Sequence, residues 1–212
     1  MTQTPIELTP SFDKREERTQ WVFRRFEHLF SEGKVLDVGC YEAPMRKLIG
    51  ASRYTGVDFV GAPDIVLNLE QVETFPFEDG SFRSVMCIEV LEHLNNLHAL
   101  ARELFRLSST QVLISLPNAW RDARLKIERG RGSIAHYGLP LEAPKDRHKW
   151  FFNADEARAF LEHIAPEGWS CRIVLTETRR SGLVRAYRRL RYSNEAYRNR
   201  YCQTVWAEYT KL

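Results

Sequence analysis

The sequence predicts an α/β protein in which helices cover both faces of a doubly wound, mostly parallel sheet. Short apolar runs of strand length alternate with amphipathic stretches of helix length up to Pro117. This alternation is typical of parallel sheets, whose strands are joined by helical crossovers. At 212 residues the chain can bury a large core as one domain. We therefore expect a single domain over residues 1–212, built on a seven-stranded sheet.

The first half of the chain supplies five of these strands. An N-terminal helical region is expected over residues 1–32, because Trp21, Val22, Phe26 and Leu29 form an apolar stripe between residues 13 and 30. The predicted strands are KVLDVGC (34–40), RYTGVDF (53–59), DIVLNL (64–69), RSVMCIE (83–89) and TQVLISLP (110–117). Helices are predicted over 43–50, ending at Gly50, and over 93–107, where five leucines recur at helical spacing.

The second half of the chain departs from this alternation. Residues 118–149 are polar, contain Gly and Pro and carry many basic side chains, which predicts a long lid loop. A helix follows over 153–164 with Asn153 as its N-cap, and WSCRIVLTET (169–178) and CQTVWAEYT (202–210) form the last pair of strands. Between these strands lies a basic insertion, residues 179–201. Its apolar and aromatic positions predict one helical stripe made of Leu183, Tyr187, Leu190, Asn194, Tyr197 and Tyr201.

Composition indicates a cytoplasmic protein. Apolar residues make up 43% and charged residues 28%, as in ordinary soluble domains. No apolar run approaches the roughly 20 residues of a membrane span, and the N-terminal residues do not have the pattern of a secretion signal. The four cysteines are far apart and form no CxxC pair, which favours reduced thiols over disulfides or a zinc site. The sequence leaves the oligomeric state open.

Positive charge is concentrated in one segment. The chain has a net charge of +3, yet residues 179–201 contain eight arginines and one acid, Glu195, so that the remainder is acidic overall. A local basic surface suits an anionic or sugar-like partner. The alternative is a solvated helix face with no partner.

Two strand ends have the features of an adenosine-binding site. Gly39 follows the first buried strand and lets the backbone approach a ligand closely, while Asp37 can accept a hydrogen bond from a ligand amine. About twenty residues later, Asp58 ends the next strand, where a carboxylate can bind both ribose hydroxyls.

These motifs resemble those of class I S-adenosylmethionine-dependent methyltransferases, which have a Rossmann-like fold. The family's first motif reads approximately Leu-Asp-x-Gly-x-Gly-x-Gly. Here LDVGCYEAP keeps Asp37 and Gly39, while Tyr41 and Ala43 replace the second and third glycines. YTGVDF, FPFEDGSFRSVMCIEVLEHL and ISLPN match later motifs in the same order, so the resemblance spans about residues 30–178. A dinucleotide-binding domain or a non-catalytic sheet is the alternative.

The resemblance implies S-adenosylmethionine as cofactor and a set of residues around it. The methionyl part would be surrounded by Asp37, Gly39, Cys40 and Glu42. The ribose and adenine would be bound by Asp58, Phe59, Asn68 and Leu69. The side of the reactive sulfonium would be flanked by Cys87, Ile88 and Glu89.

An acid–histidine cluster follows the fourth strand. In CIEVLEHL, Glu89, Glu92 and His93 have the i, i+3, i+4 spacing of one helix face, and His148 in DRHKWFF comes later, just after the lid. This pattern resembles the metal site of small-RNA 3′-terminal 2′-O-methyltransferases, and ubiquinone-pathway O-methyltransferases carry a similar Glu-x-x-Glu-His. We expect these four residues to hold Mg²⁺ or Mn²⁺. The alternatives are that His148 or His93 acts as a base beside Glu89, or that the carboxylates merely begin a helix.

The lid suggests what the acceptor is. Trp120, Tyr137, Trp150 and Phe151 could present flat apolar faces to sugar rings, although aromatic residues in loops often only cover a core. The pattern GLP…DRHKWFF resembles that of small bacterial enzymes that methylate sugars or polysaccharides. A sugar or polysaccharide hydroxyl is therefore the expected acceptor, and RNA 2′-O-methylation is the second interpretation. A non-catalytic partner of another methyltransferase is the third.

Overall fold

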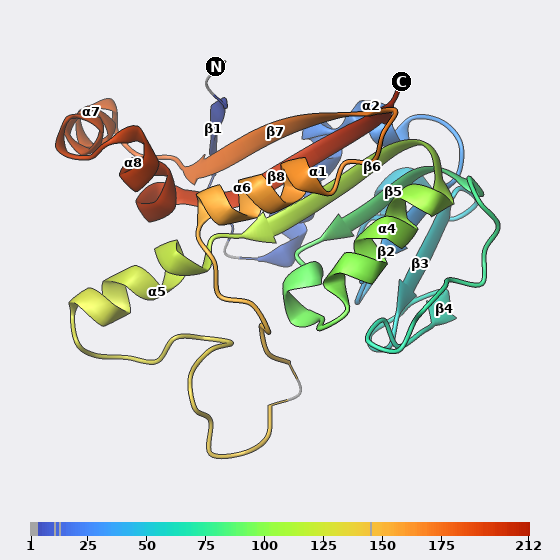
Figure 1. Cartoon of the computed structure of the whole chain (residues 1–212), viewed down its shortest axis with the longest axis horizontal. Helices are drawn as coiled ribbons and strands as arrows, with labels where there is room; N and C mark the ends of the chain where they lie inside the picture. Colours follow the sequence, from blue (N-terminus) through green and yellow to red (C-terminus); the bar gives the residue numbers. More distant parts are fainter. Residues whose placement is uncertain (1–3, 11, 13, 145) are drawn as a thin grey trace.

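The computed structural model describes residues 4–10, 12, 14–144 and 146–212, and its centre is one eight-stranded sheet (Figure 1). The strands are β1 (Ile6–Thr9), β2 (Val35–Val38), β3 (Tyr54–Asp58), β4 (Ile65–Val66), β5 (Phe82–Ile88), β6 (Ser108–Pro117), β7 (Trp169–Thr178) and β8 (Cys202–Lys211). Their order in the sheet is β1-β7-β8-β6-β5-β2-β3-β4. The predicted doubly wound α/β class is confirmed.

The strand order reverses between β2 and β5. From β2 the chain continues outward through β3 and β4, and it then returns to place β5 and β6 on the other side of β2. All of these pairs are parallel, and β8 is antiparallel to both β6 and β7. The carboxyl ends of β2 and β5 therefore lie side by side, at the position where open α/β sheets bind ligands.

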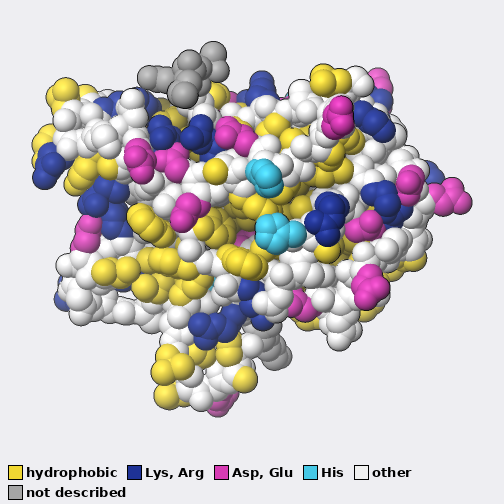
Figure 2. Space-filling model, in the orientation of Figure 1, with side chains coloured by type: hydrophobic (Ala, Val, Ile, Leu, Met, Phe, Trp, Pro, Cys, Tyr) yellow, Lys and Arg dark blue, Asp and Glu magenta, His cyan; other side chains and the backbone are white. Residues whose placement is uncertain are grey.

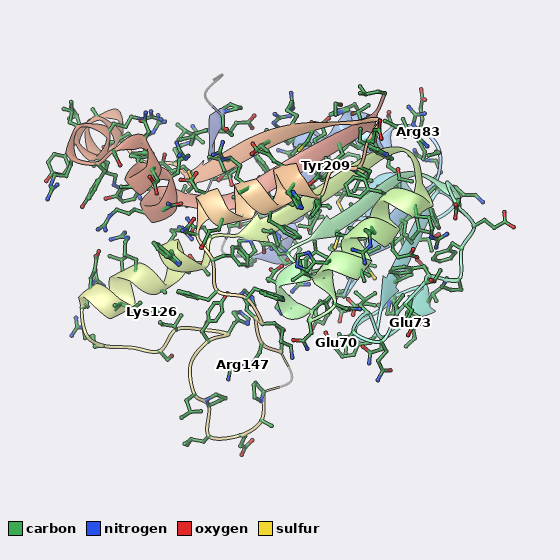
Figure 3. All side chains as sticks on the ribbon, in the orientation of Figure 1. Glu70, Glu73, Arg83, Lys126, Arg147 and Tyr209 are labelled. Atoms are coloured by element: carbon green, nitrogen blue, oxygen red, sulfur yellow. The ribbon has the colours of Figure 1, made fainter. Side chains whose placement is uncertain are left out.

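Helices cover both faces of the sheet. One face packs against α4 (Leu97–Leu107) and α6 (Ala154–His163), and the other against α1 (Arg15–Arg25), α2 (Glu27–Phe30) and α3 (Arg46–Ile49). Successive strand residues alternate between the two cores, as Val205 and Trp206 of β8 do. Tyr209, labelled in Figure 3, is fully buried, and its hydroxyl donates a 2.7 Å hydrogen bond to the carbonyl of Leu161. In the part of the chain that the structure describes, no helix has the length and hydropathy of a membrane span.

The N-terminal helical region expected over residues 1–32 also contains a strand. Residues Ile6–Thr9 form β1, which pairs in parallel with β7 and adds an eighth strand to the seven expected. A four-residue strand carries little local signal, because its hydrogen bonds are all to a segment far along the chain. The predicted helix over 13–30 is two helices, α1 and α2, divided at Phe26; residue 13 lies outside the described residues. The third predicted strand, DIVLNL, is reduced to the two residues of β4.

The helix predicted over 93–107 begins four residues later. Leu91–His93 form a single 3₁₀ turn, and α4 starts at Leu97. Asn96 precedes α4, and its side-chain amide donates to the carbonyls of Leu69 and Val72 rather than continuing a helix. Glu89, Glu92 and His93 therefore have the spacing of one helix face but do not share an α-helical face.

The lid and the insertion are more ordered than the sequence suggested. Residues Ala119–Glu128 form α5, so the lid loop is confined to the residues after it. The segment AWRDARLKIE contains no Gly or Pro, and these helix breakers are found only from Gly130 onward. The insertion forms two helices, α7 (Gly182–Arg191) and α8 (Asn194–Tyr201), so its apolar positions are not one stripe. Ser193 separates the helices and caps α8 by accepting a hydrogen bond from the amide of Ala196.

Asn118 fixes the junction between β6, α5 and α8. Its side-chain oxygen accepts a hydrogen bond from the amide of Arg121 and caps α5. Its side-chain nitrogen donates to the carbonyls of Asn199, at 3.1 Å, and Cys202, at 2.8 Å. The side chain is completely buried. Replacing it would leave buried carbonyl groups without a partner.

We predict that Asn118→Ala lowers the free energy of unfolding by about 2–3 kcal/mol. The loss of the cap accounts for about 1 kcal/mol, and the lost amide hydrogen bonds account for about 1 kcal/mol each. Urea denaturation followed by circular dichroism measures the change. Ser193→Ala is the matched control, since it removes only a cap at an exposed position. Equal losses in the two variants would contradict the role given to Asn118.

Candidate active site

The loop after β2 keeps a glycine-like backbone although two of its residues are not glycine. Gly39 has a φ of 79°, and a Cβ at this position would lie 2.3 Å from the Val90 side chain. Tyr41 and Ala43, at the positions of the family's second and third glycines, have φ values of 49° and 48°. Only a few per cent of residues other than glycine adopt such angles. The loop therefore keeps its left-handed turns although Tyr41 and Ala43 replace the two glycines.

Asp58 joins this loop to the one after β3. Its Oδ2 accepts a 2.8 Å hydrogen bond from the amide of Tyr41. Its Oδ1 accepts hydrogen bonds from the amides of Phe59, at 2.7 Å, and Val60, at 3.3 Å. The Asp58 carboxylate thus connects the loop after β2 to the loop after β3, through a contact between residues that are 17 positions apart in the sequence.

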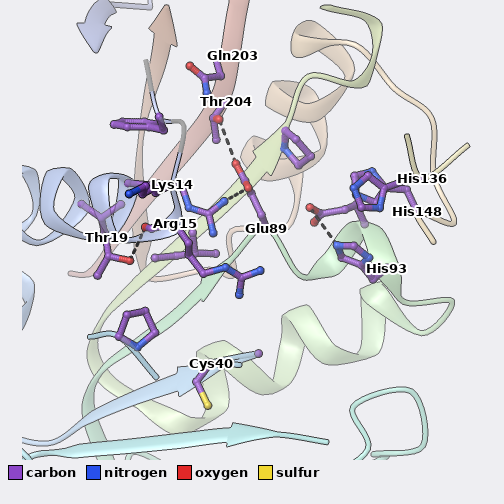
Figure 4. A pocket seen from close by; sticks show the side chains of 18 of the residues that line it. Lys14, Arg15, Thr19, Cys40, Glu89, His93, His136, His148, Gln203 and Thr204 are labelled. Atoms are coloured by element: carbon purple, nitrogen blue, oxygen red, sulfur yellow. Dashed lines mark hydrogen bonds and ion pairs between the residues drawn. The ribbon is translucent and has the colours of Figure 1, made fainter. Parts of the chain in front are cut away.

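A pocket of about 430 Å³ lies where β2 and β5 end. Figure 4 shows it from close by, with Cys40 from the β2 side, and Glu89 and three histidines from the β5 side and the lid. Eight of the predicted site residues line it: Asp37, Gly39, Cys40, Ile88, Glu89, Glu92, His93 and His148. The structure thus brings the expected methionyl side and the acid–histidine side into one cavity.

The other predicted cofactor residues lie outside this cavity. Cys87 and Leu69 are buried in the hydrophobic core. Cys87 precedes Ile88 on β5, so the alternation of the strand turns it toward α4. The side chains of Glu42, Phe59 and Asn68 are exposed, and Asp58 is buried beneath its loop amides.

Asp37 is buried at the base of the pocket. The hydroxyl of Tyr54 donates to its Oδ2 at 2.6 Å. Burial raises the pKa of Asp37 to about 7, although the Tyr54 hydrogen bond opposes this shift. The carboxyl group is therefore half protonated near neutral pH until a cation binds beside it.

Several pocket residues were missed by the sequence analysis. Lys14, Arg15 and Arg18 reach the pocket from α1 and the residue before it, and the Arg15 guanidinium lies 4.5 Å from the centre of the Tyr41 ring. Gln203 and Thr204 come from the start of β8, and Arg121 and Asp122 from α5. The basic run KREER at the start of α1 was visible in the sequence, but nothing local shows that this helix crosses the pocket.

Glu89 does not join the other members of the predicted metal site. It follows β5 with a φ of 52°, and its Oε2 forms an ion pair with Arg18. Its Oε1 accepts a 3.2 Å hydrogen bond from the Thr204 hydroxyl, drawn as a dashed line in Figure 4. Because the left-handed residue turns the chain, the Glu89 carboxylate points toward α1 and β8.

Glu92, His93 and His148 do converge. One potential ligand atom from each lies within 4.8 Å of the other two. His136, which the sequence analysis missed, stacks on His148 with ring centres 4.3 Å apart. Asp146 lies 2.5 Å from Nδ1 of His93 and 3.8 Å from Nδ1 of His136.

His148 is held as a neutral base. Its Nδ1 lies 3.0 Å from the hydroxyl of Tyr137, and that hydroxyl donates its single proton to the carbonyl of Trp150. Nδ1 of His148 must therefore donate to the Tyr137 oxygen, which leaves the lone pair on Nε2. Burial, together with the neighbouring His93 and His136, lowers the pKa of His148 to about 4. The pocket thus holds an uncharged imidazole with a free acceptor nitrogen at neutral pH.

Comparison with known families identifies the fold's function in general terms. Residues 13–164, more than half of the chain, match the family described as "Methyltransferase domain". The chain belongs to this methyltransferase family. It is an S-adenosylmethionine-dependent methyltransferase, and the cavity at the ends of β2 and β5 is its candidate active site. A sequence search of curated proteins finds no match.

Solved structures share the fold of the methyltransferase at low sequence identity. A SAM-dependent methyltransferase from Archaeoglobus fulgidus is 17% identical with a TM-score of 0.55, and the match covers 95% of this chain and 96% of that one. Magnesium protoporphyrin IX methyltransferase from Synechocystis with bound SAH is 14% identical with a TM-score of 0.53, covering 96% and 90%. The small RNA methyltransferase HEN1 is 13% identical with a TM-score of 0.59, covering 97% of this chain but 26% of that one.

We predict that the His148 imidazole of the methyltransferase stays neutral until the pH approaches 4. Its ordinary pKa is 6.5, so the unfolded chain binds more protons than the folded one between pH 6.5 and about 4. The contribution of this group to stability is therefore complete above pH 6.5 and is lost as the pH falls through that range. A histidine NMR titration, with His148→Gln to assign the resonance, measures the midpoint. A midpoint near 6.5 in the folded protein would contradict the buried, neutral imidazole.

Proposed function

We propose that this methyltransferase transfers a methyl group to a hydroxyl of a sugar, oligosaccharide or polysaccharide. The observation that carries the proposal is geometric: His148 lines the same cavity as the loop of Gly39, with the Nε2 lone pair unused. An aliphatic hydroxyl is a poor nucleophile and needs a proton acceptor of this kind. Thiol or catechol acceptors, which ionise more readily, would need less help.

The cofactor is proposed to lie across the ends of β2, β3 and β5. Asp37 would accept the ammonium group of S-adenosylmethionine, and the cations Arg15 and Arg18 suit its carboxylate. Oδ2 of Asp58 accepts one amide and retains a lone pair for a ribose hydroxyl. The exposed ring of Phe59 offers a face for adenine. The backbone of Gly39 and Cys40 is expected to lie close to the methionyl chain of the cofactor.

The protein's own groups could complete proton transfer. The acceptor hydroxyl would bind beside Nε2 of His148, with the methyl group in line on the side of Ile88. The proton would move from the hydroxyl to Nε2 as the oxygen attacks the methyl carbon and the carbon–sulfur bond breaks. Asp146, between His93 and His136, balances positive charge that develops on the histidine cluster.

A divalent cation fits the cluster in part. Oε2 of Glu92 is buried and has no hydrogen-bond partner among the described residues, as expected of an oxygen that awaits a cation. The donors would be Glu92, His93 and His148, without Glu89. Because a cation would occupy the Nε2 lone pair of His148, this arrangement is an alternative to proton transfer to His148. One carboxylate and two imidazoles favour Mn²⁺ over Mg²⁺, because magnesium prefers an all-oxygen shell. A bound cation would lower the pKa of the acceptor hydroxyl.

RNA remains the second candidate acceptor. The basic insertion and the fold shared with HEN1 support it, but a likeness at 13% identity concerns the fold alone. Against it, Arg185 and Arg188 of the insertion lie within 4 Å of the Glu177 carboxylate and are turned inward. The half-exposed rings of Trp120, Trp150 and Phe151 favour the flat faces of sugars.

We predict that labelled methyl groups pass from S-adenosylmethionine to a member of a panel of sugars and oligosaccharides, and that His148→Gln lowers kcat at least about 100-fold. His163→Gln, at an exposed histidine of α6, is the matched control and should retain full turnover. Short RNAs in the same panel test the second candidate. Transfer to RNA alone would refute the sugar assignment.

The metal is tested separately from activity. If Mn²⁺ binds, calorimetry on the wild type should detect it and Glu92→Gln should abolish it, while chelator should stop turnover. Turnover that survives chelator and depends only on His148 would leave the histidine mechanism without a metal.

We also predict that the affinity for S-adenosylhomocysteine falls about tenfold for each pH unit below 7, because the Asp37 carboxylate must be ionised to accept the ligand ammonium. The folded pKa of about 7 is raised by burial, so the binding form is lost on acidification. Calorimetry between pH 7 and pH 5 measures the slope. Asp37→Asn should bind more weakly with a flat profile, and a flat wild-type profile would contradict the placement.

A further inference from the structure

Helix α7 displays its apolar side to solvent. This ten-residue helix has no buried residue. Leu183 and Leu190 are 86% and 89% exposed, and Tyr187, between them on the same face, is also exposed. Three large apolar side chains in a row on an exposed helix are unusual for a surface that meets only water.

The opposite side of α7 holds it on the protein. Arg185 and Arg188 approach the buried Glu177 carboxylate at 3.8 and 3.7 Å. The Arg188 guanidinium also lies 4.1 Å from the centre of the Tyr201 ring. Arg185 and Arg188 are therefore turned inward, and the apolar side chains on the other side of the helix face outward. This orientation is the reverse of an ordinary amphipathic surface helix.

Neighbouring elements at this end of the molecule add further exposed apolar groups. In Figure 1, α5, the loop after it and α7 all extend beyond the end of the sheet toward which β5 and β6 point. Ile127 of α5 is 62% exposed and Leu139 of the loop is 97% exposed. Figure 2 shows hydrophobic groups over these elements with basic groups among them, and Figure 3 labels two of the cations, Lys126 and Arg147.

The positive charge of the chain is gathered at this same end. Residues 118–151 and 179–201 together contain sixteen Lys and Arg and five Asp and Glu, a net charge of +11. The rest of the chain, with a total of +3 for the whole, has a net charge of −8. Glu177 and Asp155, which lie outside these segments, pair with Arg185, Arg188 and Arg198 and reduce the charge at this end to +9. The basic charge therefore still lies on the elements that expose the leucines.

We propose that this end, formed by α5, the described loop residues 129–144 and 146–151, and α7, docks on an anionic lipid surface. Leucines that project into solvent can enter the boundary between headgroups and acyl chains, while surrounding Lys and Arg meet anionic headgroups. A second copy of the chain would bring two strongly basic ends together. RNA would use the cations and aromatic rings but would gain little from aliphatic side chains at the tips.

Vesicle binding tests this surface without any methyl acceptor, so its outcome is independent of the proposed function. The probes are vesicles of equal parts phosphatidylglycerol and phosphatidylcholine, compared with vesicles of phosphatidylcholine alone, in a sedimentation assay. The wild type should bind the mixed vesicles and lose that binding as salt rises. The double variant Leu183→Glu/Leu190→Glu should bind at least about tenfold more weakly.

The double variant Val66→Glu/Leu212→Glu is the matched control, because it changes charge equally at two apolar residues that are 75% and 89% exposed and lie outside this end. It should bind vesicles as the wild type does, and circular dichroism should show that both variants are folded. Equal binding of both variants, or no preference of the wild type for the anionic vesicles, would overturn the proposal. So would a dimer in solution that only Leu183→Glu/Leu190→Glu dissociates, because the occupant of α7 would then be a second copy.

Discussion

The pocket depends on the parallel pairing of β2 with β5. Asp37 pairs with Met86 in this register, so the loop of Gly39 and the turn of Glu89 leave the sheet at the same level. Both turns use left-handed backbone, which swings the chain away from the strand direction within one residue. The two segments therefore do not cover the ends of the strands, and the cavity lies between the segments. A shift of either strand by one residue would turn its side chains to the opposite face of the sheet.

Local sequence was sufficient for the parts of the protein that depend on neighbouring residues. The buried strands, the cap at Asn153 and the roles of Asp37 and Gly39 as pocket residues all follow from runs of a few residues. The helix limits around Asn96 and α5 were misjudged, because side-chain hydrogen bonds to distant carbonyls and the position of the first glycine decide them. These are contacts and boundaries that periodicity alone does not reveal.

The residues that sequence reasoning missed reach the pocket from distant parts of the chain. Arg18 meets Glu89 across 71 residues, and Thr204 meets it across 115. Both contacts exist because α1 and β8 flank the ends of the central strands, which is a property of the sheet order. The same two contacts explain why Glu89 does not join Glu92 and His93 in the predicted metal site, although their sequence spacing suggested that it would. The position of His148 just after the lid suggested that it returns to the strand ends, and the structure places it beside Glu92 and His93.

The segment that carries His148 is fastened directly to the turn that carries His93. The amide of Lys149 donates to the carbonyl of Glu92 at 2.7 Å, and the indole nitrogen of Trp150 donates to the carbonyl of Leu94 at 2.8 Å. These two hydrogen bonds hold the segment that carries His148 against the short turn that carries His93. His148 lies on this segment, so it can act as a base only while the two hydrogen bonds hold the segment over the pocket. In the proposed reaction, the same segment therefore supplies the base and excludes bulk water. If the segment were displaced, the sulfonium would face water, but His148 would no longer be beside it to remove a proton from that water.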